Sequence, residues 1–207
     1  IREGTAAFSL SNSALARKAP TTCLFAGPSM TTEELVCPPP TPAENVVVLE
    51  DADAVGQKIR EIVAEEAEKA ISARGHFALA IPGGSILKML AGDIANKEEW
   101  TSKTTLVYVN HKCVSMDDGD LATHAKARKL FLDDWEGVNA IVMGGTADGE
   151  QEANEYEDKI KALSDDVLPK TEAGLPSFDL SLIGVGDDGH VGSLYPGREE
   201  VLVDESG

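Results

Sequence analysis

Short apolar runs alternate with segments of helical periodicity along most of the chain, and this alternation constrains the fold more than any other feature. Five runs have the length and composition of strands, at residues 46–49, 76–81, 105–109, 138–143 and 178–185. Helices are expected between them, at residues 51–74, 86–91, 121–135 and 150–163. In the first of these, apolar residues recur every three or four positions opposite a glutamate-rich face. This order predicts an α/β domain with a mostly parallel sheet flanked by helices.

The amino-terminal part differs in composition from the rest of the chain. Residues 4–32 contain no acidic side chain and nine Ser or Thr, although the 207-residue chain carries a formal net charge of −18. A Ser-rich, acid-poor segment is typical of a transit peptide, which favours a plastid location. The same composition also fits a disordered tail, and a cytoplasmic protein is the alternative.

We place a domain boundary at the proline-rich linker 37–42, which divides the chain into an extension at 1–43 and an α/β domain at 44–207. A further interpretation of the extension is an arm that docks into a large protein complex, because a segment without a core is ordered only when something holds it. At the other end, the domain lacks a final helix or strand pair, so we expect the native chain to continue past Gly207.

The charge and the cysteines exclude several classes of partner and site. A chain with a net charge of −18 is a poor partner for nucleic acid and for anionic membrane surfaces. The apolar runs fall short of the ~20 residues that span a bilayer, so no transmembrane segment is predicted. The three cysteines, Cys23, Cys37 and Cys113, form no CxxC pair, which indicates a reduced protein without structural zinc, and no metal site is predicted.

Two polar segments that follow strands are candidates for binding an anion. Gly83-Gly84-Ser85 connects a strand to a helix, where glycines allow close backbone approach and amides point at the ligand. Asn110-His111-Lys112 follows the next strand, and His111 and Lys112 suit an anion. The carboxyl ends of parallel strands share one edge of a sheet, so both segments are expected there. Each also has a structural explanation, as a turn that needs glycine and as a solvated loop end.

The stretch 178–197, FDLSLIGVGDDGHVGSLYPG, carries the strongest chemical signal, because a strand runs into a glycine-rich acidic loop at the same sheet edge. Asp188 lies two residues before His190. A carboxylate beside a histidine fixes the tautomer of the ring and supports its charged form, as a general base requires. The alternative is a polar loop in which Asp188 caps a helix. Two other histidines have structural explanations, His76 at a strand start and His124 on a helix surface.

From residue 46 to its end the chain resembles the 6-phosphogluconolactonase family. The resemblance rests on Gly-Gly-Ser after a strand, on the Asp-Gly-His loop, and on Leu194-Tyr195-Pro196-Gly197, which is similar to the lactonase pattern Leu-Phe-Pro-Gly. Related glucosamine-6-phosphate deaminases share the histidine loop but continue with Ala-Phe-Asn-Glu-Pro. The resemblance implies a Rossmann-like fold, no cofactor, and hydrolysis of 6-phospho-D-glucono-1,5-lactone to 6-phosphogluconate in the pentose phosphate pathway.

The resemblance also implies roles for the candidate residues. His190 would be the base that activates water, with Asp188 beside it, and Gly83, Gly84 and Ser85 would hold the phosphate of a sugar-phosphate lactone. A lactone is an activated ester, so one base, a bound water and amide donors toward the developing oxyanion suffice.

Departures from the family pattern keep other functions open. The family's Asp-Glu-Arg is replaced by Asn110-His111-Lys112, the Ser before its Gly-Gly-Ser by Pro82, and the Thr after its histidine by Val191. Lys112 keeps a phosphate-binding charge but not the bidentate fork of arginine. The alternative function is therefore a catalytically impaired, lactonase-like subunit of a larger complex, a plastid complex under the transit-peptide interpretation, docked through residues 1–43. A deaminase or isomerase of another sugar phosphate is a third hypothesis, which the ending 194–197 disfavours.

Overall fold

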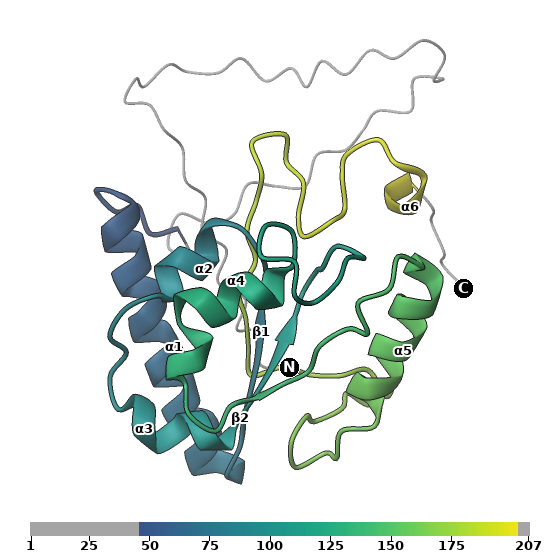
Figure 1. Ribbon diagram of the computed structural model, residues 1–207. Coiled ribbons are helices and arrows are strands. Elements are labelled where there is room, and N and C mark those ends of the chain that lie inside the picture. Colours follow the sequence, from purple (N-terminus) through teal and green to yellow (C-terminus); the bar gives the residue numbers. More distant parts are fainter. Residues whose placement is uncertain (1–45, 203–207) are drawn as a thin grey trace.

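A computed structural model describes residues 46–202, and within them the strands form one parallel sheet in the order β3-β2-β1-β4 (Figure 1). The strands are β1 (Phe77–Ile81), β2 (Thr104–Tyr108), β3 (Asn139–Ala140) and β4 (Leu180–Ser181). The helices are α1 (Ala52–Arg74), α2 (Ser85–Leu90), α3 (Lys97–Trp100), α4 (Thr123–Leu130), α5 (Gly149–Lys161) and α6 (Glu199–Leu202). The predicted α/β class is confirmed. The extension 1–43 and its docking lie outside the described residues.

Helix α1 forms where the sequence predicts it because both of its ends are capped. The side chain of Asp51 accepts a hydrogen bond from the Ala54 amide at 2.8 Å, which satisfies one of the free donors of the first turn. Gly75 ends the helix in the left-handed conformation, with φ at +83°, and its amide donates to the Ile71 carbonyl.

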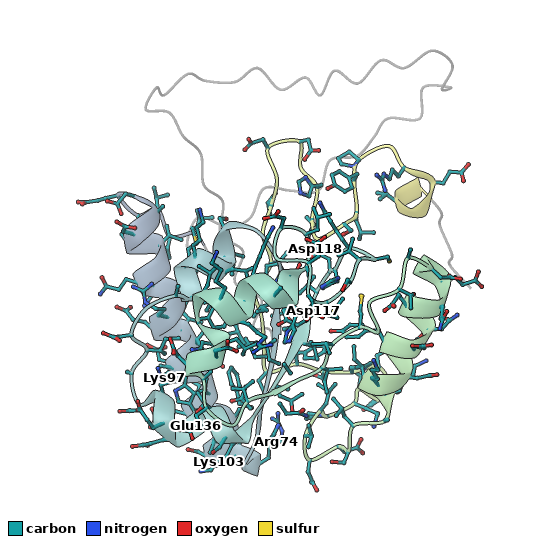
Figure 2. All side chains as sticks on the ribbon, in the orientation of Figure 1. Arg74, Lys97, Lys103, Asp117, Asp118 and Glu136 are labelled. Carbon is teal, nitrogen blue, oxygen red and sulfur yellow. The ribbon has the colours of Figure 1, made fainter. Side chains whose placement is uncertain are left out.

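The carboxyl end of α1 is tied to the sheet by one ion pair. Both terminal nitrogens of Arg74 donate to the two oxygens of Asp179, and one of those oxygens also accepts from the Ala78 amide at 2.7 Å. Figure 2 shows Arg74 near the bottom of the view, well below Asp117 and Asp118. The pair therefore fixes the amino-terminal edge of β1 and β4, away from the candidate site.

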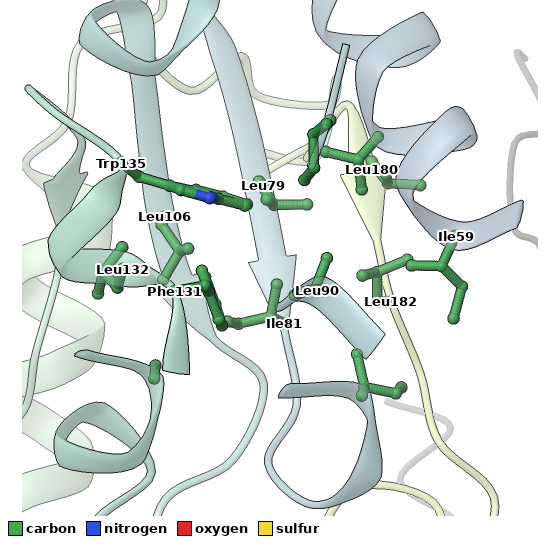
Figure 3. Close-up of a cluster of buried hydrophobic side chains, with 14 of the residues drawn as sticks. Ile59, Leu79, Ile81, Leu90, Leu106, Phe131, Leu132, Trp135, Leu180 and Leu182 are labelled. Atoms are coloured by element: carbon green, nitrogen blue, oxygen red, sulfur yellow. The ribbon is translucent and has the colours of Figure 1, made fainter. Parts of the chain in front are cut away.

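The two faces of the sheet bury different side chains. Phe77, Leu79 and Ile81 of β1 are fully buried in a cluster with residues of α1, α2 and α4 (Figure 3). On the opposite face, Ala80 and Val107 pack in a second cluster with α5. The strands are apolar on both faces because helices cover both, which is the usual pattern of a parallel sheet.

Three strand predictions differ from the structure. Residues 46–49 form no strand, because no described strand pairs with them, and their valines remain exposed. In the segment 138–143 only β3 pairs with β2. The hydroxyl of Tyr156 instead accepts the Tyr108 amide at 2.7 Å, a donor that a longer β3 would have bonded. The run 178–185 is reduced to β4, since Val185 leaves the sheet and forms a bridge with Val191.

The helix predicted at 121–135 also ends early. Helix α4 stops at Leu130 because Phe131 takes φ and ψ of −159° and −29°, and a 3-10 turn (Leu132–Asp134) follows. The break lets Phe131 and Trp135 pack together with ring centroids 4.7 Å apart. None of the helices in the described part of the chain is both long and apolar enough to cross a membrane.

Candidate active site

The carboxyl ends of β1, β2 and β4 meet at one edge of the sheet, where three loops begin (Figure 1). The loop after β1 contains Gly83 and Gly84 and leads into α2. Gly84 has φ and ψ of +76° and −143°, a region that glycine occupies and side-chain-bearing residues avoid. The Gly-Gly-Ser segment therefore needs glycine for its turn geometry.

The turn after β1 is connected to the histidine loop through Asn110, which lies two residues past the end of β2. The Asn110 Oδ1 atom accepts a long hydrogen bond from the Gly83 amide, at 3.5 Å. Its Nδ2 atom donates to the hydroxyl of Ser193 at 3.1 Å. The Asn110 carboxamide thus contacts two of the segments that the sequence analysis selected, the Gly-Gly-Ser turn and the stretch 178–197.

Asp188 and His190 form a pair within a narrow loop. Asp188 Oδ1 lies 2.5 Å from His190 Nδ1 and also accepts from the His190 amide at 3.2 Å. The hydrogen bond from the ring, followed by that from the amide, lowers the pKa of the Asp188 carboxyl. A carboxylate that accepts at Nδ1 keeps a proton there, which leaves Nε2 as the acceptor. Because no helix follows within residues 189–198, the helix-capping alternative for Asp188 is wrong.

The ring of His190 is positioned by packing as well as by hydrogen bonding. It stacks on the ring of Tyr195, with the two centroids 4.5 Å apart and the ring planes at 25°. The guanidinium carbon of Arg198 lies over the Tyr195 ring, 4.8 Å from its centroid. On the backbone side, a Cβ atom at Gly186 would lie 2.1 Å from His190 Cε1 and 2.2 Å from Nδ1. The imidazole therefore occupies the space that any side chain at Gly186 would fill.

A second histidine cluster lies at the end of β2, and it corrects the prediction that His124 is a surface residue. The half-buried His124 contacts the Tyr108 hydroxyl through Nδ1 at 2.8 Å, and the His111 ring lies edge-on to Tyr108. Burial, followed by the charge of Arg128, lowers the pKa of His124, whereas burial raises the pKa of Tyr108. The lowered pKa favours the neutral form of His124, and in its Nε2–H tautomer Nδ1 accepts the hydrogen bond from the tyrosine hydroxyl.

The other predicted phosphate ligands are accessible but less connected. Ser85 and Lys112 are exposed, and no contact within the described chain ties the Lys112 side chain to the histidine loop. Two hollows of about 400 and 470 Å³ lie elsewhere, the first beside α4 and the second between α1 and α3. The candidate site is instead an open edge between the turn after β1 and the loop after β4.

The sequence analysis placed Asn110 in a candidate segment but assigned the anion-binding role there to His111 and Lys112, and it did not identify Ser193 and Tyr195 as site residues. The position of Asn110 just past the end of a buried strand was the signal for that segment, but it did not show which of its side chains would contact the other loops. Ser193 and Tyr195 offered no such signal beyond their nearness to His190. Among residues 46–202, no group of three or more His, Cys, Asp or Glu is arranged to hold a metal ion.

Comparisons with known proteins agree on one family. Residues 50–207 match the family model for glucosamine-6-phosphate isomerases/6-phosphogluconolactonase. A probable 6-phosphogluconolactonase of Schizosaccharomyces pombe is 30% identical over 170 residues, covering 77% of this chain and 65% of that protein. The 6-phosphogluconolactonase of Synechocystis is 34% identical over 132 residues, covering 62% of this chain and 52% of that one.

A rice relative, named probable 6-phosphogluconolactonase 3, chloroplastic, is 30% identical over 166 residues, covering 75% of this chain and 50% of that protein. The chain thus spans between half and two thirds of the length of these curated relatives. Among solved structures, a 6-phosphogluconolactonase from Trypanosoma brucei matches with a TM-score of 0.60 and 20% identity, over 74% of this chain and 64% of that one. At this identity the match supports the fold.

Proposed function

The chain belongs to the glucosamine-6-phosphate isomerase/6-phosphogluconolactonase family, and on this premise we propose that it hydrolyses 6-phospho-D-glucono-1,5-lactone to 6-phosphogluconate. The observation that carries the proposal is the pair of Asp188 and His190 at the carboxyl edge of the sheet, with His190 Nδ1 2.5 Å from the carboxylate. The relatives named as lactonases supply the substrate class.

In the proposed reaction His190 acts as general base through Nε2. It takes a proton from a water molecule while the water oxygen bonds to the carbonyl carbon of the lactone. The carbonyl oxygen becomes an oxyanion, and the bond from this carbon to the ring oxygen then breaks. The ring oxygen receives the proton from His190, so the products are a free hydroxyl and a carboxylic acid that ionises. Asp188 stabilises the imidazolium that exists between the two proton transfers.

The phosphate of the substrate is proposed to lie at the turn after β1. The amides of Gly84 and Ser85 and the Ser85 hydroxyl are neutral donors, Gly83 gives the anion room to approach, and Lys112 would add a positive charge from the neighbouring loop. Glycines favour this role because they let an anion approach the backbone closely.

The test is hydrolysis of 6-phosphogluconolactone above its spontaneous rate, with the folded chain. His190→Ala should lower kcat by about 10²- to 10⁴-fold, the contribution typical of a general base. His76→Ala is the matched control, because His76 lies at the amino-terminal edge of β1 and bonds to Thr105. A folded wild-type protein without excess hydrolysis, or a His190→Ala variant as active as the His76→Ala variant, would exclude the proposed reaction.

The disfavoured deaminase alternative and the proposed plastid location each have a test of their own. Release of ammonia from glucosamine 6-phosphate would instead assign the deaminase branch of the family. A plastid location is supported by the composition of residues 4–32 and by the name of the rice relative. Failure of isolated plastids to import the full-length precursor would contradict it and favour the cytoplasm.

A further inference from the structure

Asn110 contacts both halves of the proposed site through one short side chain. Its Oδ1 atom faces the Gly83 amide at 3.5 Å and its Nδ2 atom donates to Ser193 Oγ at 3.1 Å. A backbone amide can only donate, so the oxygen of the carboxamide must face Gly83 and the nitrogen must face the loop. The orientation of the carboxamide is therefore determined by its surroundings.

Ser193 belongs to a rigid turn whose two ends carry the stacked rings. The Val191 amide donates to the Leu194 carbonyl at 3.2 Å, and the Leu194 amide donates back to the Val191 carbonyl at 3.0 Å. His190 directly precedes this four-residue turn and Tyr195 directly follows it. An anchor on Ser193 consequently limits the movement of both rings.

The close approach of Gly192 to Val109 also supports the connection between the turn and the end of β2. A Cβ atom at Gly192 would lie 3.6 Å from Cγ1 of Val109, the residue that precedes Asn110. Gly192 has a φ of +60° and no side chain, so no side chain of its own separates this point of the turn from Val109. The Asn110–Ser193 hydrogen bond thus joins segments that already lie in contact.

We propose that Asn110 is a positioning residue that couples the phosphate turn at 83–85 to the His190 loop. The inference rests on the proposed function, since it assigns the turn to the phosphate and His190 to the lactone carbonyl. The distance between these two groups in the substrate is set by its covalent structure. One side chain that contacts both loops keeps the protein's two subsites at a matching separation.

Kinetics of Asn110→Ala and Asn110→Asp separate this role from general stabilisation. Asn110→Ala removes both hydrogen bonds and should lower kcat about 10- to 100-fold, because a displacement of about 1 Å has an effect of that order. Asn110→Asp can still accept from Gly83, and the Ser193 hydroxyl can donate to it. It should lose less of kcat, but raise KM for the phosphorylated lactone about tenfold by repelling the phosphate. The KM for unphosphorylated glucono-1,5-lactone should not rise in Asn110→Asp.

The pathway through Ser193 is tested by a double-mutant cycle. If Asn110 acts through Ser193, the variant with both Asn110→Ala and Ser193→Ala should have a kcat no lower than Asn110→Ala alone. Multiplied effects in the double variant would show that the two residues act independently, and would overturn the proposed coupling.

A readout that needs no turnover distinguishes failure of the coupling from failure of the proposed lactonase reaction. The imidazole nitrogens of His190 should shift in the NMR spectrum of Asn110→Ala and of Ser193→Ala, but not in that of His76→Ala. This result supports the coupling even if the wild-type protein hydrolyses no lactone. Unchanged His190 signals in a folded Asn110→Ala variant overturn it, whatever the activity.

Discussion

Gly186→Ala is expected to inactivate the site without unfolding the protein. The added Cβ atom would lie 2.1 Å from His190 Cε1, 2.2 Å from Nδ1 and 2.9 Å from Asp188 Oδ1. The φ of Gly186 is not in the left-handed region, so alanine can adopt the backbone conformation. The nearest conflicts are therefore with the imidazole and the carboxylate, and the ring, which lies nearest, is the group that has to move.

The size of the effect follows from these distances. Carbon atoms in contact are about 3.5–4.0 Å apart, so the ring must move by roughly 1.4 Å or more. From a starting distance of 2.5 Å, a displacement of this size away from Asp188 takes Nδ1 beyond hydrogen-bond range of the carboxylate. Misplacement of a reacting group by about 1 Å can cost 10²-fold, so kcat should fall by about that factor. The free energy of unfolding should change by less than about 0.5 kcal/mol, because the loop is exposed.

Two measurements test this reasoning: the kcat for lactone hydrolysis, and the pKa of the Asp188 carboxyl followed by NMR. The His190 hydrogen bond is the largest cause of the lowered Asp188 pKa, so that pKa should rise toward its ordinary value in Gly186→Ala. Gly119→Ala is the matched control, because a Cβ there meets no atom within 4 Å. A Gly186→Ala protein with normal kcat and a still-lowered Asp188 pKa would refute the position of the ring.

Two further predictions concern stability. Tyr156→Phe leaves the buried Tyr108 amide without its acceptor at 2.7 Å, and urea denaturation should show a loss of about 1–3 kcal/mol; an unchanged unfolding midpoint would contradict this role of the hydroxyl. The backbone amides of Thr146 and Gly144 hold the pKa of the buried Glu152 below its ordinary value of 4.5. A lowered folded-state pKa contributes stability that is present above pH 4.5 and lost as the pH falls through the folded value. The melting temperature should therefore fall more steeply below pH 4.5 in the wild type than in Glu152→Gln, and parallel curves would count against this account.

The fold class followed from the sequence because burial on both faces leaves a local pattern. The strands β1 and β2 were predicted within one residue, since each is apolar along its whole length and bounded by polar or glycine residues. Helix α1 was predicted from apolar residues that recur every three or four positions, and the structure adds that Asp51 caps its start. Strand lengths at the sheet edges were not predictable, because a strand extends only as far as a partner offers free hydrogen-bonding groups. The hydroxyl of Tyr156 accepts the Tyr108 amide that a longer β3 would have bonded. Residues 46–49 have no strand beside them in the described part of the chain.

For the candidate site, the sequence by itself determined which chemical groups are available and that they follow strands. It determined that Asp188 and His190 are close, because two residues in a glycine-rich loop cannot be far apart. Only the tertiary structure decided that Asn110 bonds to Ser193, 83 residues away, and that the ring of His190 lies over Gly186. The physical reason is that contacts between loops depend on the order of strands in the sheet and on the fit of individual side chains, and neither leaves a periodic trace in the sequence.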